Sequence, residues 1–306
     1  MLQTEHFSYF RLSIPRISAI IGGFEKQRGG NGMYYAMDEI ENFRDLGGID
    51  TYSGNKVQNN RLFRCGEMTN ASFRDIEKIK ALGIDTIVDL RNDRERSEKP
   101  DPVIEGVTYI NLPFNSQKSL AGVERDKKSK ATFYEKMFEN SKTNPNAFLD
   151  YMKASYHSML TDEYSRNQIR EFLKVLADDT HQRILWHCAS GKDRTGVAAV
   201  MILEVLGARR DQIRENYLDT NKYLGRSTQE VVNVALRMGE GRDDLDQIVE
   251  SFRTSMRADD LFFFEIYDSM AAMAGSVDNY ISTILRMTDE EIRHLRNKYL
   301  STQKQQ

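Results

Sequence analysis

The 306-residue sequence contains only two cysteines, Cys65 and Cys188, and its five histidines lack a metal-ligand spacing such as HxxxH. Two cysteines are too few for a disulfide framework, and the missing histidine spacing gives no sign of a structural zinc site. We therefore expect free thiols in a reducing compartment, no metal and no cofactor.

An excess of positive charge is also missing, because 43 lysines and arginines are balanced by 46 aspartates and glutamates, for a formal net charge of -3. This balance excludes the strongly basic class of nucleic-acid binders. No apolar run reaches the roughly 18 residues needed to span a bilayer, and the N-terminus makes a poor signal peptide. We expect a cytoplasmic protein without a transmembrane segment, and the sequence leaves open secretion without a cleaved signal.

A linker rich in proline, glycine and serine is absent as well, so the length favours one domain with insertions. The first forty residues mix short apolar pieces with EKQRGGNG, and they predict a loosely ordered N-terminal arm over 1–40 before a single domain over 41–306. Residues 115–165 are too long for a plain connection and predict a helical lid or insertion.

A basic patch lies inside that insertion, which would allow peripheral contact with an anionic membrane or with an acidic protein surface. Glu124 and Asp126 are interspersed with it, so a solvated helix face is the plainer interpretation. The patch consists of Lys118, Arg125, Lys127, Lys128 and Lys130.

Strand and helix patterns alternate through the body of the chain. LFRCGEM at 62–68, IDTIVDLR at 84–91, VTYINLPF at 107–114 and RILWHC at 183–188 predict buried strands. Ser72 with Asp75, and later Thr288 with Glu291, have the spacing of capping boxes that begin helices. The alternation is typical of an α/β fold, and the remainder of the chain predicts a helical C-terminal region.

One loop, HCASGKDRTG at 187–196, carries the clearest chemistry because it joins a predicted strand to an apolar helix beginning at about Thr195. Small residues allow successive backbone N–H groups to turn toward one oxyanion, and the helix N-terminus adds its dipole. Arg194 can hold two phosphate oxygens at once. We predict that the loop binds inorganic phosphate or a phosphate ester through Cys188, Ala189, Ser190, Gly191, Lys192, Asp193 and Arg194.

Cys188 is the candidate nucleophile of this loop. Helix N-termini and nearby cations favour the thiolate form of a cysteine, which is the reactive form. In-line attack on phosphorus would give a thiophosphate intermediate that water hydrolyses. Thr195 would donate its hydroxyl to the sulfur as the sulfur leaves.

Asp193 lies between two cations and near the place where an ester oxygen would lie. A leaving alkoxide or phenolate needs a proton, and a bound phosphate dianion favours the protonated carboxyl group by repulsion. We predict that Asp193 is the general acid; the alternative is that it neutralises its neighbours or caps the helix. Lys192 would add positive charge at the mouth and so favour a polyanionic substrate.

Two other interpretations of the loop fit less well. A nucleotide-binding loop needs GxxxxGK followed by Ser or Thr, whereas Lys192 is followed by Asp193 and Trp186 takes the place of the first glycine. His187 should face away from the Cys188 sulfur, because neighbouring strand residues point to opposite faces, so a Cys–His pair is not favoured. We expect His187 to be a buried hydrogen-bonding residue that orients the loop.

The loop matches the HCxxGxxR[ST]G signature of cysteine-dependent tyrosine and dual-specificity phosphatases. Together with NFRDLGG at 42–48, LFRCGEM, DLR at 89–91 and the tail SVDNYISTILRMTDEEIRHLRNKYL, it resembles the bacterial tyrosine phosphatase family with a GKDR loop over about residues 41–300. That family includes secreted mycobacterial and listerial enzymes. The resemblance implies a tyrosine phosphatase-like α/β fold with a central, mostly parallel sheet flanked by helices, and no metal. It also implies hydrolysis of phosphotyrosine, in some members also of phosphoserine, phosphothreonine or phosphoinositides.

Residue roles follow from this resemblance. The nucleophile maps to Cys188 and the phosphate arginine to Arg194, and a similarity to myotubularin-type lipid phosphatases, which carry their acid inside the loop, supports Asp193. The WPD tripeptide of the large eukaryotic enzymes is missing. The DLR motif places Asp89 and Arg91 at the pocket edge, with Asp89 orienting the loop or serving as the competing acid. A surface ion pair is the plain alternative for Arg91.

The remaining matched positions have supporting roles. Phe43, Arg44 and Asp45 of NFRDLGG suggest a structural clamp near the site, and Cys65 is either a buried spectator or a disulfide partner that protects oxidised Cys188. We predict a metal-independent protein phosphatase acting on phosphotyrosine. The alternatives are a phosphoinositide phosphatase, a non-catalytic phosphate-binding pseudophosphatase and a sulfurtransferase.

Overall fold

The computed structural model describes residues 26–28, 33–114 and 133–301. Its centre is a sheet with the strand order β1-β2-β3-β5-β8-β6-β7. The strands are β1 (Lys26–Arg28), β2 (Met33–Tyr35), β3 (Arg44–Asp45), β5 (Leu62–Cys65), β6 (Thr86–Asp89), β7 (Thr108–Asn111) and β8 (Ile184–His187). A second small sheet pairs β4 (Lys56–Val57) with β9 (Leu300–Ser301).

The half of the central sheet that carries the 187–196 loop is parallel. β8 pairs with β5 on one side and with β6 on the other, and β6 pairs with β7, all in parallel register. The predicted parallel centre is therefore confirmed, while β1, β2 and β3 extend the sheet in antiparallel register. Since parallel strands end at one edge, the ends of β5, β6 and β8 are brought together there.

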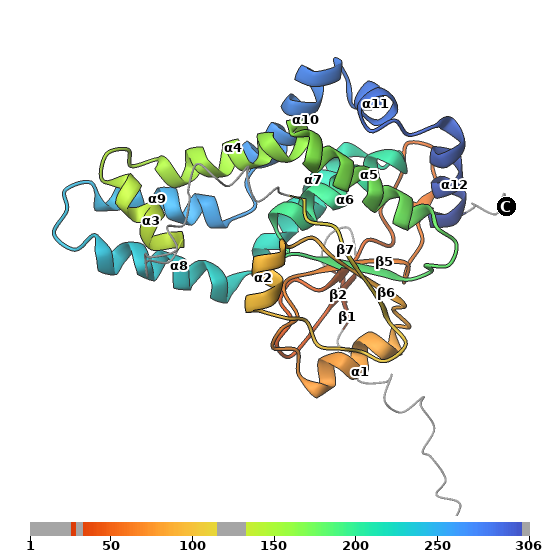
Figure 1. Cartoon of the computed structure of the whole chain (residues 1–306), viewed down its shortest axis with the longest axis horizontal. Coiled ribbons are helices and arrows are strands. Elements are labelled where there is room, and N and C mark those ends of the chain that lie inside the picture. The colour runs from red at the N-terminus through yellow and green to blue at the C-terminus, as the bar shows by residue number, and fades with distance from the viewer. Residues whose placement is uncertain (1–25, 29–32, 115–132, 302–306) are drawn as a thin grey trace, which may run out of the picture.

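Helices cover both faces of the sheet, as Figure 1 shows. α1 (Phe73–Ala81) covers one face, and α5 (Glu163–Ala177), α6 (Asp193–Val205) and α12 (Asp289–Tyr299) cover the other. α2 (Asp93–Glu98) follows β6. Both predicted capping boxes are confirmed, at the start of α1 and at the start of α12.

A group of helices extends away from the sheet to the left of Figure 1. α3 (Phe133–Ser141) and α4 (Ala147–Thr161), from the predicted insertion, pack with α8 (Gly225–Met238) and α9 (Leu245–Met256), and α4 also packs on α10 (Asp260–Ala274). α7 (Arg210–Leu218), a 3₁₀ turn (Asp219–Lys222), α11 (Val277–Asn279) and a π-helical turn (Tyr280–Ile284) complete the helical region. The lid function of this group stays a prediction, and the basic patch within 115–132 lies outside the described residues.

Alternation along the buried strands divides the core into two clusters. Leu62, Trp186 and Cys188 belong to the large cluster under α6, while Phe63 and Leu185 belong to a smaller cluster under α1. This is the period of two expected for strands buried on both faces. Neighbouring strand residues thus serve opposite faces of the sheet.

The prediction of a loosely ordered arm over residues 1–40 is wrong for its last part. β2 pairs with β3, with Tyr34 opposite Arg44, and the side chains of Tyr35 and Ile40 are buried. The strand is three residues long, and so short a segment gives no clear periodicity. Residues 1–25 lie outside the described residues.

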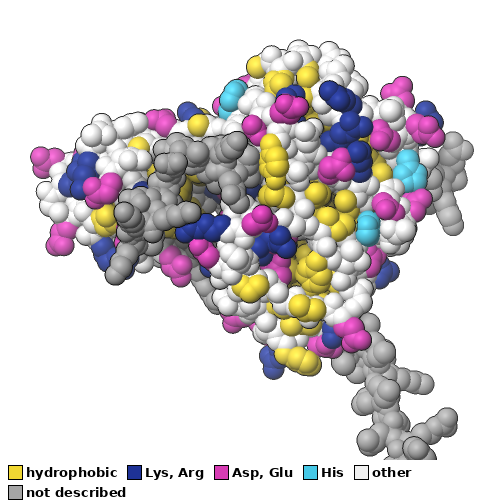
Figure 2. Space-filling model, in the orientation of Figure 1, with side chains coloured by type: hydrophobic (Ala, Val, Ile, Leu, Met, Phe, Trp, Pro, Cys, Tyr) yellow, Lys and Arg dark blue, Asp and Glu magenta, His cyan; other side chains and the backbone are white. Residues whose placement is uncertain are grey.

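No helix in the described ranges combines the length and the apolar character needed to cross a membrane. The face shown in Figure 2 carries lysines and arginines next to aspartates and glutamates over much of its area. This mixture agrees with the balanced composition.

Candidate active site

The loop between β8 and α6 lies where the parallel strands end, which is the usual position of a site in an α/β sheet. α6 begins at Asp193, two residues earlier than predicted, because the Gly196 N–H already donates to the Lys192 carbonyl at 2.7 Å. Asp193 and Arg194 are therefore in the first turn of the helix. Their side chains leave the backbone at the positive end of the helix dipole.

Backbone geometry gives the loop its shape. Gly191 has a φ of 68°, and a Cβ at this position would lie 2.5 Å from the carbonyl oxygen of Cys65. Only glycine meets both conditions without strain. Glycine is required at position 191 because the end of β5 approaches the loop closely.

The carbonyl oxygens of the loop are bound from outside. Arg64 and Asn42 both donate to the Gly191 carbonyl, at 2.8 and 2.9 Å, and the Glu67 N–H donates to the Ala189 carbonyl at 2.9 Å. No hydrogen bond to any described residue uses the N–H groups of 189–191. A loop with bound carbonyls and available N–H groups is an anion-binding nest.

Arg64 and Asn42 are functional residues that the sequence reasoning missed. Arg64 is fully buried, and burial lowers the pKa of its guanidinium to about 10, with the Cys188 sulfur among the groups that oppose this shift. Asn42, which has a φ of 60°, precedes the predicted clamp. Asn42 lies in the motif NFRDLGG and Arg64 lies in the motif LFRCGEM. The motifs therefore pointed to these positions, but the sequence analysis gave roles only to neighbouring residues.

The predicted structural clamp lies directly behind these two residues. Arg44 donates to the Asn216 carbonyl at 2.7 Å and to the Thr220 hydroxyl at 2.9 Å, and Phe43 is completely buried. Asp45 accepts from the backbone N–H groups of residues 47 and 60. These contacts join β3 to α7 and hold the sheet edge under the loop.

Cys188 is nearly inaccessible, with 1% of its surface exposed, and it lies in the electrostatic field of Arg64 and Arg194. The Thr195 hydroxyl is buried but hydrogen-bonds no described residue. The predicted bond from Thr195 to the sulfur is therefore not formed in this structure. The role of Thr195 toward a leaving thiolate stays a prediction.

Arg194 is held by an acidic partner from α2. Its two terminal nitrogens each lie 2.7 Å from a carboxylate oxygen of Glu95. Burial opposes the charge of Arg194, but the neighbouring Glu95 carboxylate outweighs burial and raises the arginine pKa. The same contact, together with the Asn92 N–H, brings the pKa of Glu95 below its ordinary value although burial alone would raise it.

Glu95 is a third residue of the site that the sequence analysis did not single out. Asn92 and Glu95 form a capping box at the start of α2, so Glu95 is fixed on the backbone before it meets Arg194. The spacing Asn-x-x-Glu directly after the DLR motif was the available signal.

Asp193 lies beside the phosphate loop and contacts a residue of the insertion. Tyr156 of α4 donates its hydroxyl to Asp193 Oδ1 at 2.7 Å, and Lys192 Nζ lies 3.2 Å from the same oxygen. The Asp193 side chain keeps 23% of its surface exposed. The carboxyl group is therefore both anchored and open on one side.

The predicted position of Lys192 at the mouth of the site is wrong. Its side chain is 2% exposed, and Nζ donates to the carbonyls of Ser255, in the last turn of α9, and of Arg257, which follows that helix. The unsatisfied carbonyls at the end of a helix attract the ammonium group inward. Only the backbone N–H of Lys192 is left for a bound phosphate.

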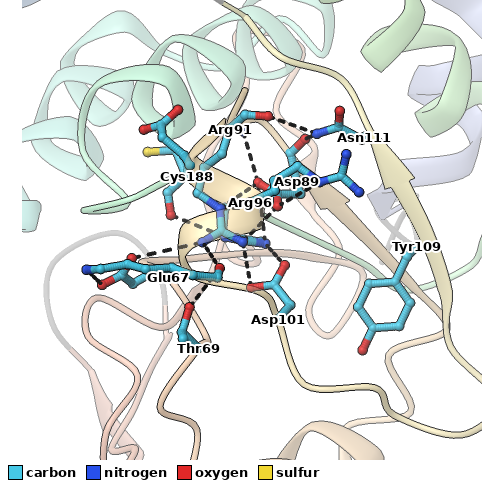
Figure 3. Close-up of polar contacts among 12 residues, drawn as sticks. Glu67, Thr69, Asp89, Arg91, Arg96, Asp101, Tyr109, Asn111 and Cys188 are labelled. Carbon is cyan, nitrogen blue, oxygen red and sulfur yellow. Dashed lines mark hydrogen bonds and ion pairs between the residues drawn. The ribbon is translucent and has the colours of Figure 1, made fainter. Parts of the chain in front are cut away.

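Asp89 and Arg91 are not a surface ion pair. Arg91 is 1% exposed and donates to both Asp89 and Asp101, as the dashed contacts in Figure 3 show. The carboxylate of Asp89 thereby accepts from the Arg91 backbone N–H, Nε and a terminal nitrogen. This arrangement suits the orienting role better than that of a competing acid.

His187 joins this network to the loop. Its Nε2 lies 3.0 Å from Asp101 and its Nδ1 lies 3.2 Å from the Cys188 carbonyl oxygen, and the ring is completely buried. Burial would raise the pKa of Asp101, but hydrogen bonds from His187 and Arg91 bring it below its ordinary value. Asp101 is another member of the site network that the sequence did not single out.

Asp89, Asp101 and His187 lie close enough to one another to hold a metal ion. Arg91 donates to both carboxylates, however, so its guanidinium already supplies the positive charge between them. The donor set therefore fits a buried ion-pair network better than a metal site.

Cys65 is paired in register with His187 but belongs to the core cluster on the α1 face, whereas Cys188 belongs to the cluster on the α6 face. Both thiols are free. Burial, with a smaller contribution from Asp101, raises the pKa of the Cys65 thiol far above its ordinary value. These facts agree with a buried spectator.

Taken together, a cysteine beneath available N–H groups, an arginine in the first helical turn and a carboxyl group beside it define a cysteine-dependent phosphatase. The chain belongs to the tyrosine phosphatase family, whose model matches residues 35–301. The family match starts at β2, in agreement with the pairing of this strand in the sheet.

Individual relatives carry related names. The chain is 28% identical over 270 residues to a Cupriavidus necator protein named as an inferred tyrosine-protein phosphatase, covering 87% of this chain and 88% of that one. It is 29% identical to the triple specificity protein phosphatase PtpB of Mycobacterium tuberculosis, covering 59% and 66% of the two chains. A tyrosine-protein phosphatase of Nostoc commune is 28% identical, with 52% and 47% covered.

Among solved structures, TpbA of Pseudomonas aeruginosa in complex with phosphotyrosine covers 66% of this chain and 89% of its own. The identity is 14% and the TM-score is 0.25, which is too low to support a comparison of the two folds.

Proposed function

We propose that this phosphatase hydrolyses phosphotyrosine in proteins through a phosphoryl group carried on Cys188. The Sγ thiolate attacks phosphorus, the bond from phosphorus to the phenolic oxygen breaks, and the Asp193 carboxyl group gives its proton to that oxygen. Water then attacks phosphorus, Asp193 accepts a proton from the water, and the S–P bond breaks to restore the thiolate and release inorganic phosphate.

Hydrogen-bond donors stabilise the negative charge of the phosphoryl group in both steps of this reaction. The N–H groups of the loop and the guanidinium of Arg194 would hold the equatorial oxygens, which carry the negative charge of the transition state. The observation that carries the proposal is that the carbonyls of Ala189 and Gly191 are bound from outside the loop, while the N–H groups of 189–191 bond no described residue. A phosphate is the tetrahedral anion that such a nest fits.

The substrate range is a separate part of the proposal. Phosphotyrosine is the first choice, and phosphoserine, phosphothreonine and phosphoinositides follow from the resemblance described above. The phosphoinositide alternative also rested on a charge at the mouth, and Lys192 does not supply one because its side chain is buried. A reducing compartment such as the cytoplasm agrees with two free thiols.

The test is a panel of phosphotyrosine, phosphoserine and phosphothreonine peptides and short-chain phosphoinositides. We expect the phosphotyrosine peptide to be hydrolysed with the highest kcat/KM, with inhibition by vanadate and no effect of a chelator. Cys188→Ser should abolish turnover, and Arg194→Lys should lower kcat by roughly 10²–10³-fold.

Retention of turnover by Cys188→Ser would refute the nucleophile. If the wild-type protein hydrolyses no member of the panel but still binds vanadate, the non-catalytic phosphate-binding alternative is favoured.

A further inference from the structure

A tyrosine from the inserted helices contacts the proposed acid, and the mechanism above makes no use of it. Tyr156 of α4 is completely buried and donates to Asp193 Oδ1 at 2.7 Å. Its hydroxyl oxygen is also 2.7 Å from that of Tyr217 in α7. Two buried hydroxyl groups therefore stand in a chain that ends on the Asp193 carboxyl group.

The Tyr156 ring is fixed from the side. It stacks on Phe262 of α10 with a centroid distance of 5.2 Å and an interplanar angle of 9°, and Lys192 Nζ lies 5.4 Å from the same Phe262 ring. Phe262 thus orders both groups that contact Asp193 Oδ1. Burial raises the pKa of the Tyr156 hydroxyl far above its ordinary value, and Asp193 adds to this shift, so Tyr156 remains a donor at every working pH.

The two oxygens of Asp193 have different surroundings. Oδ1 receives the Tyr156 hydroxyl and lies 3.2 Å from Lys192 Nζ, whereas no hydrogen bond from the described part of the chain reaches Oδ2. A carboxylic acid carries its proton on one oxygen. The proton is therefore directed to Oδ2, to which no described residue donates a hydrogen bond.

We propose that Tyr156 is a positioning residue of the reaction: it fixes Asp193 Oδ1 so that Oδ2 presents the proton to the leaving oxygen of the substrate. This inference rests on the proposed role of Asp193 as general acid. It assigns a function in the chemistry to α4, which is far from the loop in sequence and belongs to the helical insertion.

The bond also has a consequence for protonation. Tyr156 and Lys192 face Asp193 from α4 and from the loop, Arg194 lies next to it in α6, and Tyr217 of α7 stands behind Tyr156. Each direct contact to the Asp193 carboxyl group is a hydrogen-bond donor or a cation, the kind of group that stabilises negative charge. Removal of the Tyr156 hydroxyl takes away one of these donors and, at the same time, releases the Asp193 side chain from its position.

The test compares Tyr156→Phe with the wild type on phenyl phosphate, whose leaving group needs a proton, and on p-nitrophenyl phosphate, whose leaving group needs it less. We expect kcat on phenyl phosphate to fall roughly ten-fold, the value of one charge-assisted hydrogen bond, and kcat on p-nitrophenyl phosphate to fall much less. The alkaline limb of the pH profile of kcat/KM should move to higher pH.

Tyr280→Phe is the matched control. The Tyr280 hydroxyl is also buried and donates at 2.7 Å, but to the Leu160 carbonyl in the last turn of α4, and not to Asp193. It should lower the melting temperature as Tyr156→Phe does while leaving the ratio of the two substrates and the pH profile unchanged. Equal losses on both substrates, or an unmoved alkaline limb in a folded Tyr156→Phe, would overturn the proposal.

A second variant keeps the proposal testable if Tyr156→Phe does not fold. Site-specific replacement of Tyr156 by a fluorinated tyrosine keeps the ring and makes the hydroxyl a stronger donor, so the alkaline limb should move to lower pH; no movement would refute the role. Asp193→Asn separates the two hypotheses. If it shows no dependence on the leaving group, the acid role itself is wrong, whereas a strong dependence there with none in Tyr156→Phe refutes only the positioning role.

Discussion

Arg194 and Glu95 face each other with both terminal nitrogens of the guanidinium bonded, so the arginine is oriented before a substrate arrives. An arginine side chain otherwise loses rotamer freedom on binding its ligand. Glu95 is itself fixed by the capping box of α2. The orientation of Arg194, the proposed phosphate-binding side chain, thus depends on the start of a short helix after the DLR motif.

Replacement of Glu95 tests this orientation. Glu95→Gln should lower kcat/KM about ten-fold, because a neutral amide holds the guanidinium less firmly than a carboxylate does. The matched control is Glu98→Gln on the same helix, whose exposed pairing with Arg94 should contribute little to activity. Unchanged vanadate affinity in Glu95→Gln would contradict the orienting role.

The same residue should give stability a pH dependence. The pKa of Glu95 is below its ordinary value in the folded protein because Arg194 and the Asn92 N–H outweigh burial. Its contribution to stability is therefore complete above the ordinary pKa of 4.5 and is lost as the pH falls through the lower folded value. Denaturant unfolding from pH 6 to about pH 3 should show that the free energy of unfolding falls less steeply with acid in Glu95→Gln than in the wild type. The same pH dependence in both proteins would count against this linkage.

At the scale of elements, the loop and its helix follow from local sequence almost completely. Small residues, the apolar run of α6 and the capping boxes of α1 and α12 are local signals, and each is present within two residues of its predicted position. The partners that fix the loop are not local. Asn42, Glu95 and Tyr156 come from three separate segments, and only the folded topology brings them to the loop.

Lys192 shows how an element changes the function of a residue. The position of Lys192 in the loop sequence predicted a positive charge at the mouth of the site. In the structure, the carbonyls at the end of α9 bind its ammonium group inside the protein. Lys192→Ala should lower stability by about 1–3 kcal/mol because buried carbonyls lose their donor. The ratio of phosphoinositide to phosphotyrosine hydrolysis should stay constant. A selective loss of phosphoinositide hydrolysis would instead show that the Lys192 charge lies at the mouth of the site.

At the scale of the whole molecule, the sheet separates the two thiols. Register and alternation place Cys65 toward the α1 face and Cys188 toward the α6 face, although the two residues are close in the sheet. A disulfide requires the two Cβ atoms to approach to roughly 4 Å and to point toward each other. This topology argues against Cys65 as the partner of oxidised Cys188.

Peroxide treatment provides the check. We expect mass spectrometry of the treated protein to show oxidation on the Cys188 peptide and no Cys65–Cys188 linkage, because the raised pKa of Cys65 keeps it a thiol. Cys65→Ala should lose activity to peroxide at the wild-type rate. Faster inactivation of this variant, together with a linked peptide in the wild type, would show that Cys65 protects the site.

The overall architecture was predictable in kind but not in detail. Buried strands and alternating helices indicate the α/β class, because hydrophobic periodicity is a local property of the chain. The parallel centre was expected from the family resemblance. The short strand β2 and the packing of α3 and α4 against α8 and α9 depend on contacts between distant segments, for which one sequence gives no signal. The same limit explains why Tyr156, 37 residues before Asp193, was not identified.

The central claim is that Cys188 carries the phosphoryl group during turnover, and rapid acid quench tests it most directly. Wild-type protein mixed with excess phosphotyrosine peptide, quenched within one turnover and digested, should yield a phosphoryl group on the peptide that contains Cys188. The same experiment on Cys188→Ser should yield none. A phosphoryl group on another residue, or turnover by Cys188→Ser without any phosphorylated enzyme, would contradict the account.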